Sequence, residues 1–309
     1  LLAIFILFIS LSLIIAFIGY QISDILSKSE IYLNKLEEIY YQLLHHIEIN
    51  FGINKSELIN KNINFGETFK ENFSNIIGFV GTSGSIIGDT LLIPLYMFFF
   101  IYYRKFFKTF LFKVFSNGND FKIKILINKL YQVHQDYLIG LSTVMFIVGV
   151  LNSISLLVLG IENPFFYGFL AAILLLIPYV GIFIGSLIPA LIALITKDSY
   201  IYSVLVIGSF SFIQFIEGNF ITPKITGSKL NINSLVAIVS IIAFSMLWGI
   251  SGMIIALPIV ASLKIIFDAI PELQAYGFLL SEPQEQLLNS YARIRLKKWR
   301  QIRKNKQNN

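Results

Sequence analysis

The chain has 309 residues, of which 56% are hydrophobic and only 14% are charged. Soluble globular domains contain about 45–50% apolar and ~25% charged residues, so this composition excludes an ordinary water-soluble fold, whose single core could not hide the excess. The absence of cysteine excludes disulfides and cysteine-based metal sites, and the basic residues behind the net charge of +6 cluster beside hydrophobic segments, where lipid head groups and not nucleic acid are the expected partner.

Long apolar runs that are nearly free of charge predict membrane-spanning helices. Such runs cover residues 1–19, 86–103, 138–159 and 203–216, and a helix needs roughly 20 apolar residues to cross a bilayer. Because lipid offers no hydrogen-bond partner to the backbone, these runs must be helical. They also lack the period-two alternation of a β-barrel. The sequence therefore predicts an all-α, polytopic membrane protein. The chain opens at Leu1 inside an apolar run and without a methionine, so we expect further residues upstream.

The first half of the chain alternates between apolar and polar regions. A spanning helix at 1–20 leads into a mildly acidic helical region at 21–85, which suits the extracytoplasmic side. A second spanning helix at 86–103 is followed by a basic region at 104–137, which the positive-inside rule places in the cytoplasm. Its aromatic part, Phe106–Phe115, is suited to a helix that lies on the membrane surface.

The second half, residues 138–271, is predicted to be a transmembrane transport region. Two of its apolar tracts, 165–196 and 232–267, are too long for one span and are interrupted in the middle by Gly- and Pro-containing breaks. Each half is short for a full crossing, so we predict two broken helical hairpins that dip into the membrane and return. If both halves of a hairpin crossed the membrane fully, the chain would still return to the side on which it started. The sequence therefore leaves open how deep each hairpin reaches. Either way the basic tail at 272–309 is cytoplasmic.

Paired broken helices indicate a transport site, because half-helix ends offer dipoles and free backbone groups to a solute. The simpler interpretation is that Gly and Pro merely kink membrane helices. Gly181 and Gly185 are spaced for close backbone approach, either for packing or for sliding. The residues that we expect to form breaks and hinges are Pro178, Gly181, Gly185, Pro189, Pro223, Gly249, Gly252 and Pro258.

A polar cluster at the inner end of span 203–216 is the strongest candidate for a solute or ion path. Gln214, Glu217 and Asn219 lie within two turns, and a carboxylate near hydrocarbon by default marks an ion or proton path. Alternatively, Glu217 is a solvated helix end, or it pairs with Lys224 or Lys229.

Asn152 is a further candidate for the path. It lies three residues before Ser155 inside the apolar run 138–159. Hydrogen bonding between helices is the simpler explanation for both side chains.

The second half contains three ordered motifs. They are Pro178-Tyr179-Val180-Gly181 with Gly185 and Pro189, Gln214-x-x-Glu217-x-Asn219-x-Ile221-x-Pro223-x-Ile225-x-Gly227, and Trp248-Gly249-x-x-Gly252-x-x-x-Ala256-x-Pro258 running on to Lys264. This ordered set resembles the motifs of the autoinducer-2 exporter family of prokaryotic transporters, and the resemblance covers Leu1 to about Pro271.

The resemblance implies an elevator-type carrier of the prokaryotic inner membrane that assembles as a homo-oligomer, with a pentamer expected. It further implies export of autoinducer-2, or alternatively sodium or lithium efflux in exchange for protons. The chain departs from the family pattern at its start, where the first two hydrophobic segments are absent. The basic tail Arg293–Asn309 lies outside the shared motifs.

Enzyme motifs in the sequence are incomplete. Gly81-Thr82-Ser83-Gly84 fits the Gly-x-Ser-Gly of rhomboid proteases, but that chemistry needs a histidine base on a later membrane helix, and His134 lies in the predicted cytoplasmic region. Gly88-Asp89 is similar to part of the motif of aspartyl intramembrane proteases, but a convincing partner aspartate is lacking. No phosphate-binding loop is present, so the driving force is expected to be an ion or proton gradient.

We therefore expect no enzyme activity, no cofactor and no metal site. Three hypotheses remain. They are export of a small polar solute, cation/proton antiport, and a non-transporting membrane assembly protein whose helix Asp24–Ile47 binds a partner.

Overall fold

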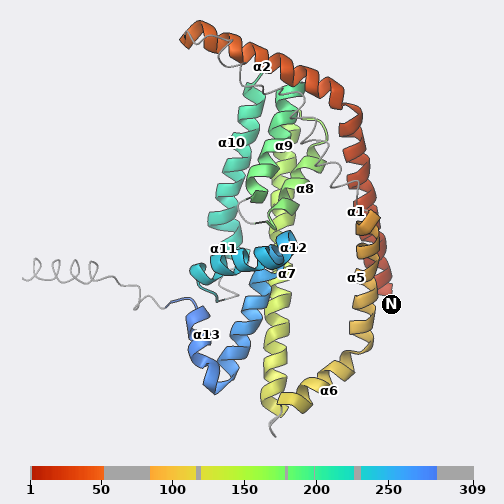
Figure 1. Cartoon of the computed structure of the whole chain (residues 1–309), viewed down its shortest axis with the longest axis vertical. Coiled ribbons are helices and arrows are strands. Elements are labelled where there is room, and N and C mark those ends of the chain that lie inside the picture. Colours follow the sequence, from red (N-terminus) through yellow and green to blue (C-terminus); the bar gives the residue numbers. More distant parts are fainter. Residues whose placement is uncertain are drawn as a thin grey trace, which may run out of the picture. The chain divides into compact units, whose positions relative to one another are not determined.

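The computed structural model describes residues 2–51, 84–115, 120–177, 180–197, 199–225 and 231–283. Within these ranges all regular elements are helical, and the one strand-like contact is an isolated antiparallel bridge between Ile232 and Ser281 (Figure 1). The all-α prediction is confirmed. Among the described residues, three helices are long and apolar enough to cross a membrane, namely Phe121–Val158, Ile201–Ile225 and Ser234–Ala269.

The helices are numbered in chain order, and Figure 1 carries the same labels. They are α1 (Leu2–Ser27), α2 (Ser29–Phe51), α5 (Gly84–Tyr102), α6 (Arg104–Phe115), α7 (Asp120–Val158), α8 (Pro164–Leu174), α9 (Val180–Thr196), α10 (Ile201–Ile216), the π-helix η1 (Glu217–Ile221), α11 (Thr222–Ile225), α12 (Ser234–Ala269), the 3-10 helix η2 (Pro271–Leu273) and α13 (Gln274–Leu280).

The chain forms two compact units, which are described separately. Unit 1 comprises Leu1–Asn117, Leu156–Phe166 and Leu187–Ile207. Unit 2 comprises Gly118–Ser155, Tyr167–Ser186 and Gly208–Asn309.

Unit 1 joins the N-terminal helices to the loop that follows α7. Helix α1 continues to Ser27, beyond the expected end at residue 20. Just after it, Lys28 Nζ lies 3.2 Å from Asp24 Oδ2 and 3.5 Å from Glu162 Oε2. The rings of Phe17 and Phe166 are 6.2 Å apart in an edge arrangement. These contacts tie α1 to a segment more than a hundred residues later in the chain.

The second half of α9 and the first half of α10 also pack together in unit 1. Ala193 and Val206 are completely buried. The Ser203 hydroxyl donates a hydrogen bond to the Ala190 carbonyl oxygen. Pro189 lies inside α9 and is fully buried. The small alanines therefore let α10 approach α9 closely, in the way that small residues serve membrane helix pairs.

Unit 2 contains most of α7, which is one continuous helix of 39 residues. The predicted boundary between residues 137 and 138 is wrong, because no proline interrupts the helix and its polar first part continues directly into the apolar part. At this length α7 is about 58 Å long, well beyond the ~30 Å hydrocarbon core. Its polar start therefore has to extend out of the membrane.

The first broken tract folds back on itself. A Cβ added to Gly181 would lie 1.6 Å from the Leu174 carbonyl oxygen, and one added to Gly185 would lie 2.9 Å from Ala171 Cβ. A continuous helix would separate residues 171 and 185 by about 21 Å, so α8 and the start of α9 form an antiparallel hairpin in backbone contact. The predicted break is confirmed, although Pro178 itself lies outside the described residues.

The second broken tract is interrupted inside α12. Trp248 has φ −135° and ψ 18°, and Gly249 has φ 60° and ψ −139°, a left-handed φ that favours glycine. A Cβ on Gly252 would lie 1.9 Å from the Phe244 carbonyl oxygen, whereas a continuous helix would separate residues 244 and 252 by about 12 Å. The chain therefore reverses at this break, as predicted.

Helix α13 closes the base of the second hairpin by packing on α12 (Figure 1). Asn233 caps α12, since its Oδ1 accepts from Val236 N at 2.8 Å. Its Nδ2 donates to the carbonyl oxygens of Leu279 at 2.7 Å and Ser281 at 3.2 Å. The first residues of the region that we assigned to the basic tail, 272–281, are thus part of the hairpin's packing, because one side chain connects both ends of it.

Candidate functional site

The end of α10 holds the carboxylate of Glu217 in a buried position. Glu217 is 9% exposed and begins the π-helix η1. Gln214 Nε2 donates to Glu217 Oε2 at 2.5 Å, and the Thr222 hydroxyl donates to Glu217 Oε1. Both carboxylate oxygens therefore bind neutral donors from the same helical segment.

The sequence left two alternatives for Glu217, a solvated helix end or a pair with Lys224 or Lys229, and the geometry supports neither among the described residues. The side chain is buried and is not a solvated helix end. Within the described part of the chain, none of the ion pairs involves Glu217. Lys224 is exposed, and Lys229 lies outside the described residues.

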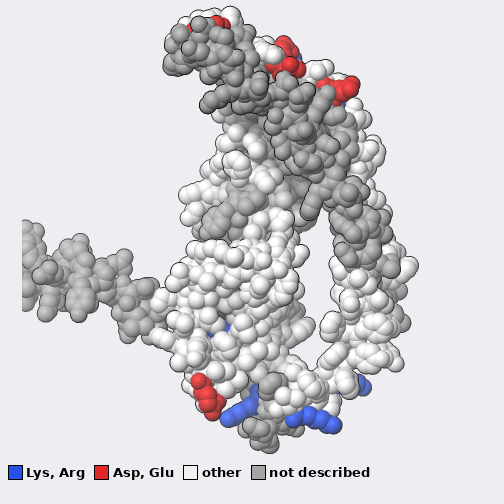
Figure 2. Space-filling model, viewed as in Figure 1, with Lys and Arg blue, Asp and Glu red and all other residues white. Residues whose placement is uncertain are grey.

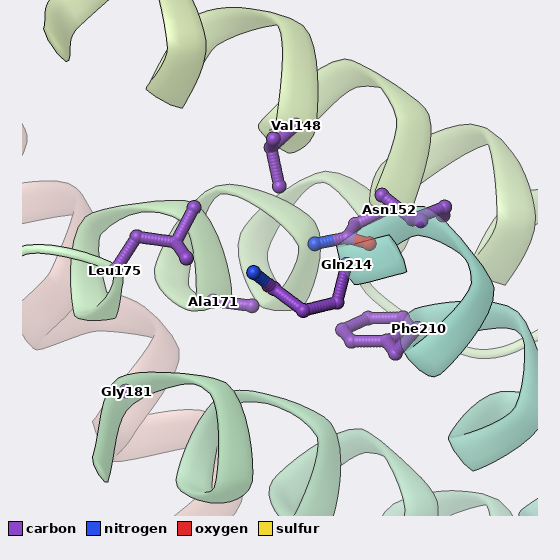
Figure 3. Close-up of a pocket in the computed structure, with 8 residues that line it drawn as sticks. Val148, Asn152, Ala171, Leu175, Gly181, Phe210 and Gln214 are labelled. Atoms are coloured by element: carbon purple, nitrogen blue, oxygen red, sulfur yellow. The ribbon is translucent and has the colours of Figure 1, made fainter. Parts of the chain in front are cut away.

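A small cavity adjoins Gln214 in unit 2. Its volume is about 20 Å³, slightly above the ~10–15 Å³ that a single water molecule requires. Asn152 and Gln214 are its polar lining residues, and apolar side chains such as Val148 and Phe210 form the rest of the wall. Figure 3 shows the amide groups of Asn152 and Gln214 entering the same space from α7 and α10. The cavity is therefore suited to one small polar occupant.

Asn152 has an unsatisfied acceptor. The residue is 4% exposed, and its Oδ1 has no hydrogen-bond partner within the described part of the chain. A buried polar atom without a partner costs about 1–3 kcal/mol, so such atoms in folded proteins call for an explanation such as a bound water, an ion or a ligand. The neighbouring candidate, Ser155, does form the interhelical bond expected of it, because its Oγ donates to Ser209 Oγ at 2.7 Å.

Close packing of α8 on α7 brings the first hairpin to this cavity. A Cβ on Gly168 would lie 2.3 Å from Ser153 Oγ and 2.8 Å from Ser153 Cα, so only glycine permits this approach. Val148 and Ala172 belong to the buried core that joins the two helices. As a result Gly181, at the break between α8 and α9, lines the cavity.

Three of the four predicted path residues thus come together, and the fourth does not join them. Asn152 and Gln214 share the cavity, with Glu217 bonded behind Gln214. Asn219 is exposed, and its Nδ2 donates to the Phe215 carbonyl oxygen of its own helix at 2.8 Å. Thr222, which lies five positions after Glu217, was not among the predicted residues. It is brought to the carboxylate by a π turn, whose hydrogen bonds join residues i and i+5.

The remaining predicted hinge residues lie away from the cavity. Gly249 and Gly252 form the break in α12, but neither lines the cavity. Pro258 is half-buried inside α12, where its carbonyl oxygen accepts from Ser262 Oγ at 2.9 Å. Pro223 is exposed in α11.

Residues considered for enzyme or metal chemistry do not form a site among the described residues. Residues 81–83 and the side chain of Asp89 lie outside the described part of the chain. Both ring nitrogens of His134 form hydrogen bonds within the protein. Nδ1 lies 2.8 Å from the Leu130 carbonyl oxygen, and Nε2 lies 3.1 Å from Ser262 Oγ. No group of three or more His, Asp or Glu side chains in the described ranges could hold a metal ion.

Residues 1–272 match the sequence profile of a family described as "AI-2E family transporter". The chain belongs to the AI-2E family. This AI-2E family member is 38% identical over 130 residues to the "Putative transport protein YrrI" of Bacillus subtilis (strain 168), a match covering 42% of this chain and 36% of YrrI. It is 27% identical over 146 residues to the "AI-2 transport protein TqsA" of Escherichia coli (strain K12), covering 47% of this chain and 42% of TqsA.

The matched segments span about two fifths of these relatives' own length. Family membership together with the apolar helices indicates a membrane protein of a transporter family. It also confirms the resemblance that the three motifs indicated.

Proposed function

We propose that this AI-2E family member is a secondary transporter that exports a small polar solute, such as the signalling molecule autoinducer-2, using an ion or proton gradient. The observation that carries the proposal is the buried carboxylate of Glu217, which binds Gln214 beside a cavity lined by Asn152, whose amide oxygen has no partner within the described part of the chain. The similarity to TqsA, named as an AI-2 transport protein, supports the solute class. The location is a prokaryotic inner membrane, and the expected assembly is a homo-oligomer, by family resemblance a pentamer.

Glu217 is suited to couple protonation to the cavity. An ionised carboxylate only accepts hydrogen bonds, and both of its oxygens now do so from Gln214 and Thr222. On protonation one oxygen becomes a donor, and a turn of the Gln214 amide or of the Thr222 hydroxyl would supply it with an acceptor. Because Gln214 also lines the cavity, a proton on Glu217 changes the polar group that the cavity presents.

Exchange of a monovalent cation for protons is the second candidate, and the size of the cavity favours it. A volume of about 20 Å³ admits an ion or a water molecule but not an organic solute in this conformation. Amide oxygens suit hard cations. Export of an organic solute therefore requires the cavity to widen during the transport cycle.

Proteoliposomes containing the full chain test this proposal. Glu217→Gln keeps the size of the side chain but removes the titratable proton, so proton-coupled flux should fall to background. Glu30→Gln, an exposed position on α2, is the matched control and should keep wild-type flux. Transport that is unchanged in Glu217→Gln removes this residue from the mechanism.

The same vesicles separate the candidate functions. Uptake of autoinducer-2 driven by an imposed gradient supports export, whereas dissipation of a pH gradient by Na⁺ supports antiport. No flux with either supports the third hypothesis, a non-transporting assembly protein.

A further inference from the structure

Helix α6 has two chemically distinct faces. Successive residues rotate by about 100° around a helix, which places the basic residues on one half and most of the apolar residues on the other. The basic half carries Arg104, Lys105, Lys108 and Lys113, and the apolar half carries Phe106, Phe107, Phe110, Leu111 and Val114. No acidic residue occurs in α6. The helix is therefore amphipathic and uniformly cationic.

The apolar half of α6 is uncovered in the described part of the chain. Phe106 is 67% exposed, Phe110 is 55% exposed and Val114 is 49% exposed. Apolar side chains that are contiguous and exposed mark a surface for lipid or for a partner. This face of α6 is therefore a candidate binding surface for lipid or for a partner.

The connection to α5 places α6 at the end of an apolar helix. Helix α5 ends at Tyr102, and only Tyr103 separates it from Arg104. Tyrosines are typical of the boundary between hydrocarbon and water. A helix that starts at this boundary, with one apolar and one cationic half, has the features of helices that lie in the membrane surface.

We propose that α6 lies in the head-group region of an anionic leaflet, with its phenylalanines in the acyl boundary and its lysines on lipid phosphates. Charge complementarity selects this occupant. A second copy packed on the apolar half would leave the cationic half without a counter-charge, whereas the head-group region of an anionic leaflet provides acyl chains for one half and phosphates for the other. Lys108 also keeps its Nζ 5.9 Å from the Phe112 ring centroid, so aromatic contact and phosphate binding are available to the same side chain. Figure 2 shows basic atoms along α6 in unit 1.

The natural absence of cysteine allows a direct test with single labels. Phe110→Cys on the apolar half and Thr109→Cys on the polar half are each labelled with a bimane dye in the full chain. Both variants are reconstituted in bilayers containing brominated lipids. We expect quenching at position 110 to exceed quenching at position 109 by at least twofold. Equal quenching at the two positions, or excimer formation between pyrene labels at position 110 on different copies, overturns the proposal.

Lipid charge is tested by a second set of variants. In bilayers that mix neutral and anionic lipids, spin-labelled phosphatidylglycerol should be enriched around the wild-type protein. Changing Lys105, Lys108 and Lys113 together to Gln should reduce this enrichment by about half or more. The matched change of the same three residues to Arg, which keeps the charge, should preserve the enrichment. Enrichment that survives the Gln variant rules out α6 as the anionic-lipid site. Neither result depends on what the protein transports.

Discussion

Asn152 combines burial with an amide oxygen that has no partner in the described part of the chain. Leucine is close to asparagine in size and removes the unpaired acceptor, whose burial costs about 1–3 kcal/mol. We therefore expect Asn152→Leu to leave the thermal stability of the detergent-solubilised protein unchanged or to raise it, while transport in proteoliposomes falls strongly. This opposite response distinguishes a binding residue from a packing residue.

Ser155→Ala is the matched control for Asn152→Leu. It removes the bond to Ser209 and should lower the free energy of unfolding by about 1 kcal/mol with flux retained. Wild-type transport by Asn152→Leu would mean that the cavity takes no part in the mechanism.

At the scale of single residues, the sequence predicted the contact between Gln214 and Glu217 but not the contact between Thr222 and Glu217. Gln214 and Glu217 lie three positions apart, a spacing at which helical side chains meet, and they do bond. Asn219 is close to them in sequence, but its amide donates to the carbonyl oxygen of Phe215 in its own helix. No local signal announces the π turn that brings Thr222 to the carboxylate. The meeting of Asn152 with Gln214 is a tertiary contact that periodicity alone does not encode.

Among the elements, the first hairpin depends on glycine at its break. In Gly181→Ala the added methyl would lie 1.6 Å from the Leu174 carbonyl oxygen, so α8 and α9 would have to separate. We expect a loss of stability of about 2 kcal/mol or more, seen as a lower melting temperature together with reduced transport.

Gly208→Ala is the control for this prediction, because nothing lies within 4 Å of a Cβ at that position in α10. Alanine is a better helix former than glycine, so this variant should stabilise the protein by about 0.5–1 kcal/mol. Similar melting temperatures for the two variants would contradict the close hairpin packing.

The breaks were predictable at this scale because Gly and Pro are local signals. The continuity of α7 and the packing of α13 on α12 were not predictable in this way. The change from polar to apolar composition within α7 suggests a boundary, but composition alone does not end a helix without a stop signal. The attachment of α13 rests on Asn233, which bonds to residues 46 and 48 positions later. Contacts at such separations leave no periodic trace in a sequence.

For the molecule as a whole, the distribution of charge predicts an orientation in the membrane. Helix α2 carries Glu30, Glu37, Glu38 and Glu48, whereas the charged residues of α6 are all basic, and Figure 2 shows acidic atoms along α2. From the positive-inside rule we expect α2 on the outside, and α6 and the C-terminal end of the chain in the cytoplasm.

Labelling in intact cells checks this orientation. Glu37→Cys on α2 should react with a membrane-impermeant maleimide in whole cells, whereas Glu272→Cys in η2 should react only after the membrane is permeabilised. Both positions are exposed, and the unchanged chain contains no cysteine, so it provides a blank. The reverse pattern would invert the assignment, and labelling of both positions in whole cells would remove it.

The π-helix at Glu217–Ile221 makes the number of residues in this segment as important as their identity. Thr222 reaches the carboxylate only because the wider turn accommodates one residue more than an α turn does. Loss of a single residue between 217 and 222 would return the segment to regular α geometry and rotate everything beyond it by about 100°. The hydroxyl would then face another direction, and one carboxylate oxygen would lose its donor, although every remaining side chain was kept. A relative that is one residue shorter at this place would have to stabilise its acid by other means.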